Sequence, residues 1–152
     1  FLGNAMKHIS PRINFHFITP CRLPERKRLK LFIFSLFNHE KHQLTDLSYI
    51  FCDDDYLLKL NRSFLNHHYF TDILTFPFSA PESRVVSGEV YVSVDRVREN
   101  AQDRDIPFQH ELHRVIFHGG LHLCHYKDKS KSDRLIMRAK EDQYLKKYFK
   151  GH

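Results

Sequence analysis

Hydrophobic and polar residues alternate along residues 12–19, which read RINFHFIT. Ile13, Phe15 and Phe17 fall on one side of an extended chain there, and Asn14 falls on the other. A period of two residues predicts a half-buried strand. Strands are predicted in three further segments: LSYIFCD (47–53), TDILTFPF (71–78) and GEVYVSVD (88–95).

The hydrophobic period lengthens to three and four residues between Pro24 and Glu40. Leu29, Ile33 and Leu36 recur at this spacing among basic residues, which predicts an amphipathic helix. Four more helices are predicted: one from the acidic triplet 53–55 through Phe64, a short one over 96–102 capped by Asp95, one over 107–124 opened by Pro107, and one over 131–150 after the capping sequence SKSD.

Strands and single helices thus alternate along a chain of 152 residues, 41% of them hydrophobic. A chain of this size supports one hydrophobic core, so residues 1–152 are predicted to form a single domain. The order of elements predicts an α+β fold in which a mixed four-stranded sheet packs against helices. The segment FLGNA before Met6 is compatible with an expression remnant ahead of a native start, and the prediction leaves it out.

Charge is unevenly distributed along the chain, whose formal net charge is +6. Residues 22–30 carry five basic groups and one acidic group, and residues 127–150 carry nine and four. The middle segment 46–111 is acidic, with six basic and twelve acidic groups. If the two ends fold together they form a basic face suited to phosphate backbones, although a basic chain alone more often reflects a solvated surface.

The cysteines and the absence of long apolar runs predict the cellular location of the protein. Cys21, Cys52 and Cys124 are an odd number without a secretory signal, which disfavours a disulfide scaffold and predicts a cytoplasmic location. Because no apolar run approaches the length that crosses a bilayer, no membrane partner is expected.

Candidate metal ligands lie in the string HGGLHLCHYKDKS, residues 118–130. His118 and His122 are four residues apart on the helix predicted over 107–124, so their imidazoles share a face and can bind one ion. This spacing is half of the HExxH zinc motif, but Gly119 stands where the motif has its glutamate, which disfavours a metalloprotease. In a chain with 12 histidines, two at this spacing also arise by chance as core or surface residues.

Gly119 and Gly120 are unusual in the middle of a predicted helix. Each costs about 1 kcal/mol relative to alanine. A cost of this kind indicates that another part of the backbone approaches closely, or that a substrate needs the room.

The string HGGLHLCHYKDK, preceded by TDILTFPF and GEVYVSV, resembles the YbeY family of metal-dependent endoribonucleases. That family's pattern is HGxLHLxGYDH behind a T-[DN]-[VI]-L-[ST]-F segment and a G-[DE]-[IV] strand, and the likeness spans about residues 47–142. The resemblance implies an α+β fold with a metal helix like that of the zincins, a catalytic metal usually taken as zinc, and no small-molecule cofactor. It also implies action on single-stranded RNA at the 3′ end of 16S ribosomal RNA, with the small ribosomal subunit as partner.

On this resemblance His118 and His122 are the first two metal ligands, and Asp128 stands where the family has the third histidine. Two histidines and a carboxylate form a valid catalytic zinc set with a position open for water, and the carboxylate also suits Mn²⁺ or Mg²⁺. The alternative for Asp128 is a solvated loop acid among lysines. His125, in place of the family glycine, is a rival third ligand, but that glycine marks the end of the helix.

A second departure from the family pattern lies in LNRSFLNHHYFTD, residues 60–72, which resembles LNxxYRGKDxxTD. Leu65 stands where the family has an arginine important to its activity, and His67 or His68 are the alternative positive donors to RNA. Leu65 therefore separates two hypotheses: a metal-dependent single-strand endoribonuclease, and an RNA-binding ribosome-assembly factor that keeps the fold and metal but has little catalysis.

Three acids join His118 in the predicted catalytic set. Glu111 lies seven residues before His118 on the same helical face, where it is placed to orient a ligand, with an ion pair to a lysine as the alternative. Asp72 and Glu89 lie in the family-like motifs and are candidates for proton transfer or ligand support, against purely structural roles at strand ends.

Overall fold

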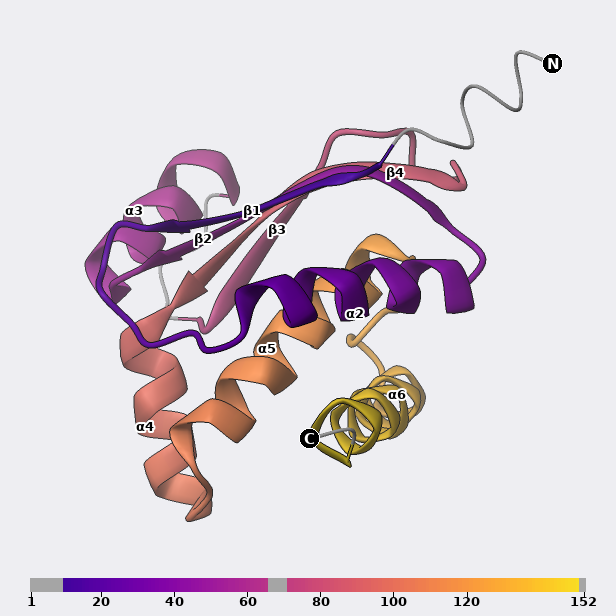
Figure 1. Cartoon of the computed structure of the whole chain (residues 1–152). Coiled ribbons are helices and arrows are strands. Elements are labelled where there is room, and N and C mark those ends of the chain that lie inside the picture. Colours follow the sequence, from indigo (N-terminus) through magenta and orange to yellow (C-terminus); the bar gives the residue numbers. More distant parts are fainter. Residues whose placement is uncertain (1–9, 66–70, 151–152) are drawn as a thin grey trace, which may run out of the picture.

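A computed structural model describes residues 10–65 and 71–150 of the chain (Figure 1). Its elements in chain order are β1 (Arg12–Phe17), α2 (Arg26–His39), β2 (Gln43–Cys52), α3 (Asp54–Leu65), β3 (Ile73–Pro77), β4 (Val85–Ser93), α4 (Val94–Arg104), α5 (Phe108–Leu123) and α6 (Lys131–Lys150). Every predicted strand and helix is present, while the segment before Met6 lies outside the described residues. Within the described ranges, no helix has the length and apolar character needed to cross a membrane.

The four strands form one mixed sheet in the order β1-β2-β4-β3. β1 pairs with β2 and β2 pairs with β4 in parallel, whereas β3 pairs with β4 in the antiparallel sense. Parallel neighbours need a crossover connection, and α2 supplies it between β1 and β2. The predicted α+β fold with a mixed four-stranded sheet is therefore confirmed.

Two strands begin earlier than the sequence pattern predicted. β2 starts at Gln43 rather than at residue 47, and its register against β4 shifts between Leu44 and Asp46. This bulge leaves Leu44 and Leu47 both buried although they are three residues apart, so the period of two is interrupted. β4 starts at Val85 rather than at residue 88, because Val85 pairs with the early start of β2.

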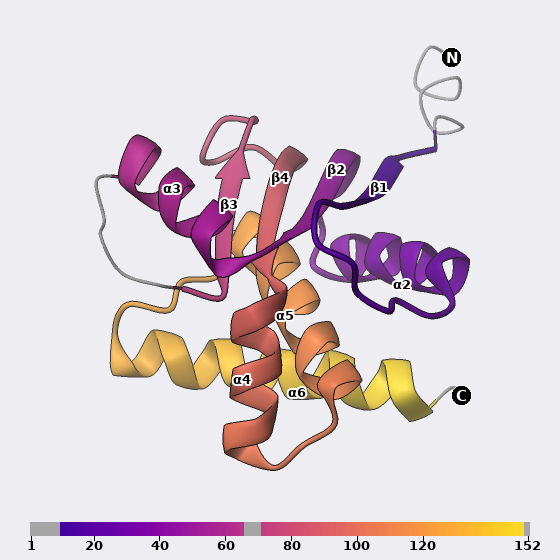
Figure 2. The same cartoon turned by 90° about the vertical axis from the view of Figure 1, so that its left-hand side faces the viewer.

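The helices cover the two faces of the sheet unequally (Figures 1 and 2). α2 and α5 pack against one face, α6 packs on the side of α5 that points away from the sheet, and α3 lies against the opposite face. α5 is therefore enclosed between the sheet and α6. This position explains why even its polar residues Glu111 and His113 are buried.

α5 approaches the sheet most closely at Gly119. A Cβ atom at that position would lie 2.7 Å from Val90 Cγ1 and 2.9 Å from Ile73 Cδ1, which is too close for a side chain. The sequence analysis expected another backbone, or a substrate, to come close to these glycines, whereas the near neighbours of Gly119 are side chains of the sheet. A Cβ atom at Gly120 would lie 3.5 Å from Phe37, an ordinary contact, so packing does not require glycine there.

The start of α4 corrects one predicted cap. Ser93 is the N-cap, and its Oγ accepts a hydrogen bond of 3.2 Å from the Arg96 N–H. The prediction of Asp95 as the cap was wrong, because Asp95 already lies in the first turn of the helix. Its carboxylate instead accepts a hydrogen bond of 3.0 Å from the Asp54 N–H and so joins α4 to the start of α3.

The two basic ends of the chain lie together. Arg28 near the start of α2 donates to the carbonyl oxygen of Tyr148 near the end of α6. Its guanidinium also lies 4.0 Å from the centroid of the Tyr148 ring. The segments that carry the excess positive charge are therefore neighbours in the fold.

Candidate metal centre

The end of α5 sets the position of the candidate ligands. The helix ends at Leu123, and His125 follows in the left-handed conformation with φ 75°. The His125 N–H donates to the His122 carbonyl (2.9 Å) and the Tyr126 N–H donates to the Leu121 carbonyl (3.1 Å), which are the two hydrogen bonds of a Schellman motif. The helix thus ends before His125, at the position where the sequence analysis expected it to end.

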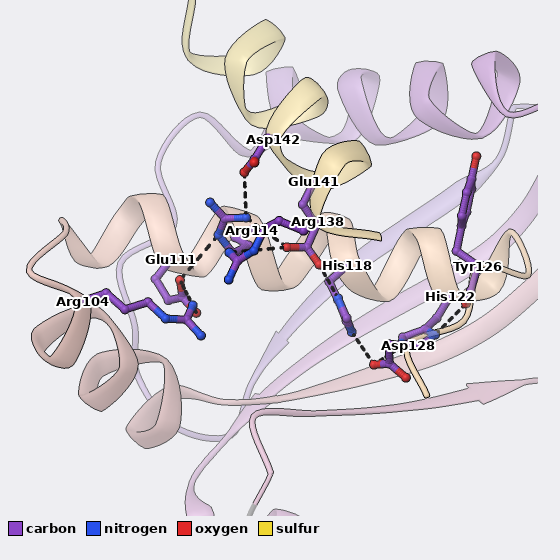
Figure 3. A network of polar contacts seen from close by, with 10 residues as sticks. All are labelled: Arg104, Glu111, Arg114, His118, His122, Tyr126, Asp128, Arg138, Glu141 and Asp142. Atoms are coloured by element: carbon purple, nitrogen blue, oxygen red, sulfur yellow. Dashed lines mark hydrogen bonds and ion pairs between the residues drawn. The ribbon is translucent and has the colours of Figure 1, made fainter. Parts of the chain in front are cut away.

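The turn brings Asp128 back to the two histidines of α5 (Figure 3). One carboxylate oxygen, Oδ2, lies 3.1 Å from His122 Nε2 and 3.4 Å from His118 Nε2. The ligand atoms of all three residues lie within 4.8 Å of one another. Zinc bonds of about 2.1 Å in a tetrahedron place neighbouring ligand atoms roughly 3.4 Å apart, so this set fits a small divalent ion.

A hydrogen-bonding partner contacts Nδ1 of each histidine, the ring nitrogen on the opposite side from Asp128. Tyr126 presents its carbonyl oxygen 3.0 Å from His122 Nδ1, and Glu141 presents Oε2 2.5 Å from His118 Nδ1. Since a carbonyl oxygen only accepts hydrogen bonds, His122 Nδ1 is the donor in its contact with Tyr126. With Nδ1 engaged in this way on both histidines, both Nε2 atoms face Asp128, the side on which a metal would bind.

Glu141 is a site residue that the sequence analysis missed. It is 5% exposed, and its Oε1 accepts a hydrogen bond of 3.0 Å from Arg114. Burial raises the pKa of the Glu141 carboxyl group, but the hydrogen bonds from His118 and Arg114 outweigh it and the pKa is lowered. The sequence signal was its position among Met137, Tyr144 and other apolar residues on the buried side of α6.

Glu111 lies on the same helix as His118 but contacts two arginines. Its two carboxylate oxygens each lie 3.0 Å from Arg104 Nη1, and Arg114 Nε lies 3.8 Å away. Burial raises the pKa of Glu111 despite these charges. Glu141, rather than Glu111, makes the contact with His118 that the sequence analysis had assigned to Glu111 (Figure 3).

The two other predicted acids lie in different places. Asp72 precedes β3 and lines the same pocket as His118, where burial raises the pKa of its carboxyl group. Glu89 lies on the opposite face of the sheet, because β4 side chains alternate and the adjacent Val90 faces α5. Its carboxylate accepts a hydrogen bond of 3.0 Å from the Tyr91 hydroxyl.

The alternative ligand His125 points away from the other two histidines. Its Nε2 lies 3.2 Å from the Ser83 carbonyl oxygen, and its ring centroid lies 5.3 Å from that of His42. Leu65 is the last residue of α3, and the alternative RNA donors His67 and His68 lie outside the described residues.

A pocket of about 200 Å³ is lined by two of the three candidate ligands, His118 and Asp128. Its other walls come from α4, α5, α6 and the residue that precedes β3. Charged side chains dominate the lining: Asp72, Glu111, Asp128, Glu141, Arg104, Arg114, Arg134, Arg138 and His118, with Val115 and Met137 between them. A polyanion with a divalent counter-ion is the kind of ligand that such a pocket can bind.

Comparison with known proteins identifies the same family along nearly the whole chain. The family model described as endoribonuclease YbeY matches residues 25–149. The endoribonuclease YbeY of Flavobacterium psychrophilum is 42% identical over 134 residues, which are 88% of this chain and 94% of that protein. The one from Cytophaga hutchinsonii is 43% identical over 127 residues, 84% of this chain and 88% of that protein. The solution structure of TM1509 from Thermotoga maritima has a TM-score of 0.61 at 27% identity and covers 93% of this chain and 91% of that one.

Proposed function

Since this chain belongs to the YbeY family of endoribonucleases, we propose that it cleaves single-stranded RNA with a divalent metal ion held by His118, His122 and Asp128. The observation that carries the proposal is the clustering of these ligand atoms within 4.8 Å of one another, beside a charged pocket. Zinc is the proposed ion, and the carboxylate ligand makes Mn²⁺ or Mg²⁺ the alternatives.

Different residues of the site have different proposed roles in the reaction. When bound, a divalent ion polarises a phosphoryl oxygen and lowers the pKa of its water toward about 7. Glu141 and the Tyr126 carbonyl contact the two Nδ1 atoms, so that both Nε2 atoms would face a bound ion. Asp72 is proposed to accept the proton that this water releases. Asp72 shares the pocket with His118, and burial raises the pKa of the Asp72 carboxyl group. Glu111 positions two arginines of the pocket wall.

The proposed substrate is the 3′ region of 16S ribosomal RNA, processed on the small ribosomal subunit during assembly or quality control. Support comes from the basic ends of the chain, which lie together and suit a phosphate backbone. The proposed location is the cytoplasm, where Cys21, Cys52 and Cys124, all free thiols, would stay reduced.

One observation favours a second candidate function. Leu65 stands where the family pattern has an arginine, so no guanidinium acts from that position. A protein with this change can keep the fold, the metal and RNA binding and still cleave slowly. The second candidate is therefore an RNA-binding ribosome-assembly factor with little catalysis.

A cleavage assay separates the two candidates. Purified protein is incubated with single-stranded and duplex RNA in Zn²⁺, Mn²⁺ or Mg²⁺ and then with a chelator, and its metal content is measured in parallel. We expect single-stranded RNA to be cut, the chelator to stop cleavage, and His118→Ala and Asp128→Asn to lose both metal and activity. His16→Ala is the matched control, because His16 is exposed on the outer face of β1.

Each result has a defined meaning. Metal-loaded wild-type protein that binds RNA and leaves it intact would favour the assembly-factor candidate. Full metal occupancy in Asp128→Asn would show that Asp128 is not a ligand and would contradict the proposed centre.

A further inference from the structure

One face of α6 forms a wall of the pocket beside the metal centre. Arg134, Met137, Arg138 and Glu141 all line that pocket, and their spacing of three, four and seven residues places them on the same side of the helix. The two arginines therefore share a pocket with the ligand His118 (Figure 3 shows Arg138).

Two of the four carboxylates that line the pocket, Glu111 and Glu141, are held in ion pairs with residues outside α6. Glu111 pairs with Arg104 at 3.0 Å, and Glu141 contacts Arg114 at 3.0 Å and His118 at 2.5 Å. Arg114 also contacts Asp142, at 3.0 Å. These ion pairs use both arginines that α4 and α5 bring to the pocket.

Arg134 and Arg138 of α6 use few of their guanidinium N–H donors in contacts with other described residues. Among the described residues, the Arg134 side chain makes one hydrogen bond, from Nη1 to the Lys129 carbonyl at 2.6 Å. Arg138 Nη1 lies 4.0 Å from Glu141 Oε1, the outer limit for an ion pair, and its side chain is 49% exposed. Each guanidinium offers five N–H donors, so most donors of this pair can reach a ligand from solvent.

The charge of the pocket favours an anion once the metal is bound. Four arginines face four carboxylates in its lining, and a divalent ion adds two positive charges. The planar fork of a guanidinium matches two oxygens of a phosphate group, which a lysine does less well.

We infer that Arg134 and Arg138 form a phosphate-binding site on α6 that holds a backbone phosphate of the RNA strand next to the metal centre. The inference rests on the proposed function, since it names where α6 contacts that substrate. It assigns the two arginines to binding and positioning of the strand rather than to metal binding.

Binding measured with and without metal tests this site independently of cleavage. The probe is a single-stranded oligonucleotide of eight uridines, titrated by fluorescence anisotropy at several salt concentrations, both in zinc and in chelator, and a gel checks that the strand stays intact. We expect the double variant Arg134→Gln/Arg138→Gln to bind roughly tenfold more weakly, and its plot of log affinity against log salt to be shallower by about 0.7, the loss of one phosphate contact on a single strand. Arg134→Lys/Arg138→Lys should recover the salt slope and only part of the affinity.

The matched control is Lys59→Gln/Arg84→Gln, which removes the same charge from the segment 46–111, outside the two basic ends of the chain. Lys59 is exposed on α3. Arg84 is exposed and donates to the Lys41 carbonyl as Arg134 does to Lys129, and neither control residue lines the pocket. Equal losses in the control and the test variant would overturn the site, and so would unchanged binding in the test variant. Wild-type protein that binds no RNA with or without metal would overturn it as well. Wild-type protein that binds but does not cleave RNA would overturn only the proposed activity.

Discussion

The geometry of His118 depends most directly on Glu141. The carboxylate lies 2.5 Å from His118 Nδ1 and 3.0 Å from Arg114, so one buried group connects a candidate ligand to a fixed cation. Carboxylates in this position orient the imidazole and make it a better ligand. At the proposed centre, the strength of metal binding would therefore depend partly on α6, a different helix from the one that carries the histidines.

Replacing Glu141 by glutamine keeps its shape and removes its charge. We expect Glu141→Gln to bind zinc 10- to 100-fold more weakly, the usual range for a group that supports a ligand. Competition with a chromophoric chelator measures this affinity. Asp142→Asn is the matched control, because Asp142 also lies 3.0 Å from Arg114 but is largely exposed. Equal affinities in the two variants would show that the contact with His118 does not matter for the metal.

The sequence predicted the candidate ligands but not their support. His118, His122 and Asp128 could be found because they lie within eleven residues of one another, and helix geometry relates the first two directly. Glu111 shares a helical face with His118, but seven residues separate them by about 10 Å along the axis, too far for contact. Glu141 reaches His118 from another helix, and no helical period contains that information.

Glu40, at the end of α2, connects that helix to the loop between α5 and α6 and to α6 itself. It accepts hydrogen bonds from Tyr126 (2.7 Å), Lys140 (3.2 Å) and Tyr144. The carbonyl of Tyr126 supports His122, so the position of a ligand depends on a contact between three elements. Burial raises the pKa of Glu40, but the hydrogen bonds from Tyr144, Tyr126 and Lys140 outweigh it and the pKa is lowered.

A lowered pKa makes this contribution depend on pH in a defined direction. The stability that ionised Glu40 adds is complete above the ordinary glutamate pKa of 4.5 and is lost as the pH falls through the lower folded value. We expect Glu40→Gln to lower the free energy of unfolding by about 2 kcal/mol at pH 7, a typical value for hydrogen bonds to a charged group. The difference from wild type should shrink below pH 4.5. Urea unfolding across this range measures it.

The exposed Glu82 provides the control for that series. Glu82→Gln should change the stability little at any pH, because an exposed charge contributes little. A Glu40→Gln effect that stays constant down to acidic pH would mean that the carboxylate charge is not what stabilises the loop.

The two adjacent glycines of α5 form a natural pair for testing how closely the helix meets the sheet. Alanine at 119 would place its Cβ 2.7 Å from Val90, and we expect the strain to cost about 1–3 kcal/mol. Alanine at 120 meets only ordinary contacts, so the helical preference for alanine should stabilise the protein by up to about 1 kcal/mol. Thermal and urea unfolding measure the stability of Gly119→Ala and Gly120→Ala. If both substitutions changed the free energy of unfolding in the same direction, this packing would be contradicted.

The sequence predicted the elements best where side chains mark their ends. The capping sequence before α6 forms as expected: the Asp133 N–H donates to Ser130 Oγ (3.0 Å), and the Ser130 N–H donates to Asp133 Oδ2 (3.3 Å). The start of β2 was missed because the bulge at Leu44 breaks the alternation from which strands are predicted. The order of the strands comes from packing over long sequence separations, which the local pattern leaves open.

At the scale of the whole molecule, the candidate centre exists only when the layers are assembled. Its ligands come from α5 and the following loop, and their supports come from α6 and, through the loop, from α2. α5 lies between the sheet and α6 (Figure 2). Contacts with Glu141 and with the Tyr126 carbonyl fix the directions of the two histidine rings. In the unfolded chain these groups are separated, so a metal that needs all of them binds the folded state.

Preferential binding to the folded state links the metal to thermal stability. An ion present at 100 times its dissociation constant adds about 2.7 kcal/mol, and for a chain of this size each kcal/mol raises Tm by roughly 2–4 °C. We therefore expect zinc to raise the Tm of the wild-type protein by about 5–10 °C and a chelator to reverse the rise. Binding of zinc to the 12 histidines and three cysteines of the unfolded chain reduces the effect, so the comparison that decides is between variants. The shift should vanish in His118→Ala and Asp128→Asn and persist in His16→Ala, because only the first two changes remove a ligand from the folded state. A shift of equal size in all four proteins would place the zinc elsewhere.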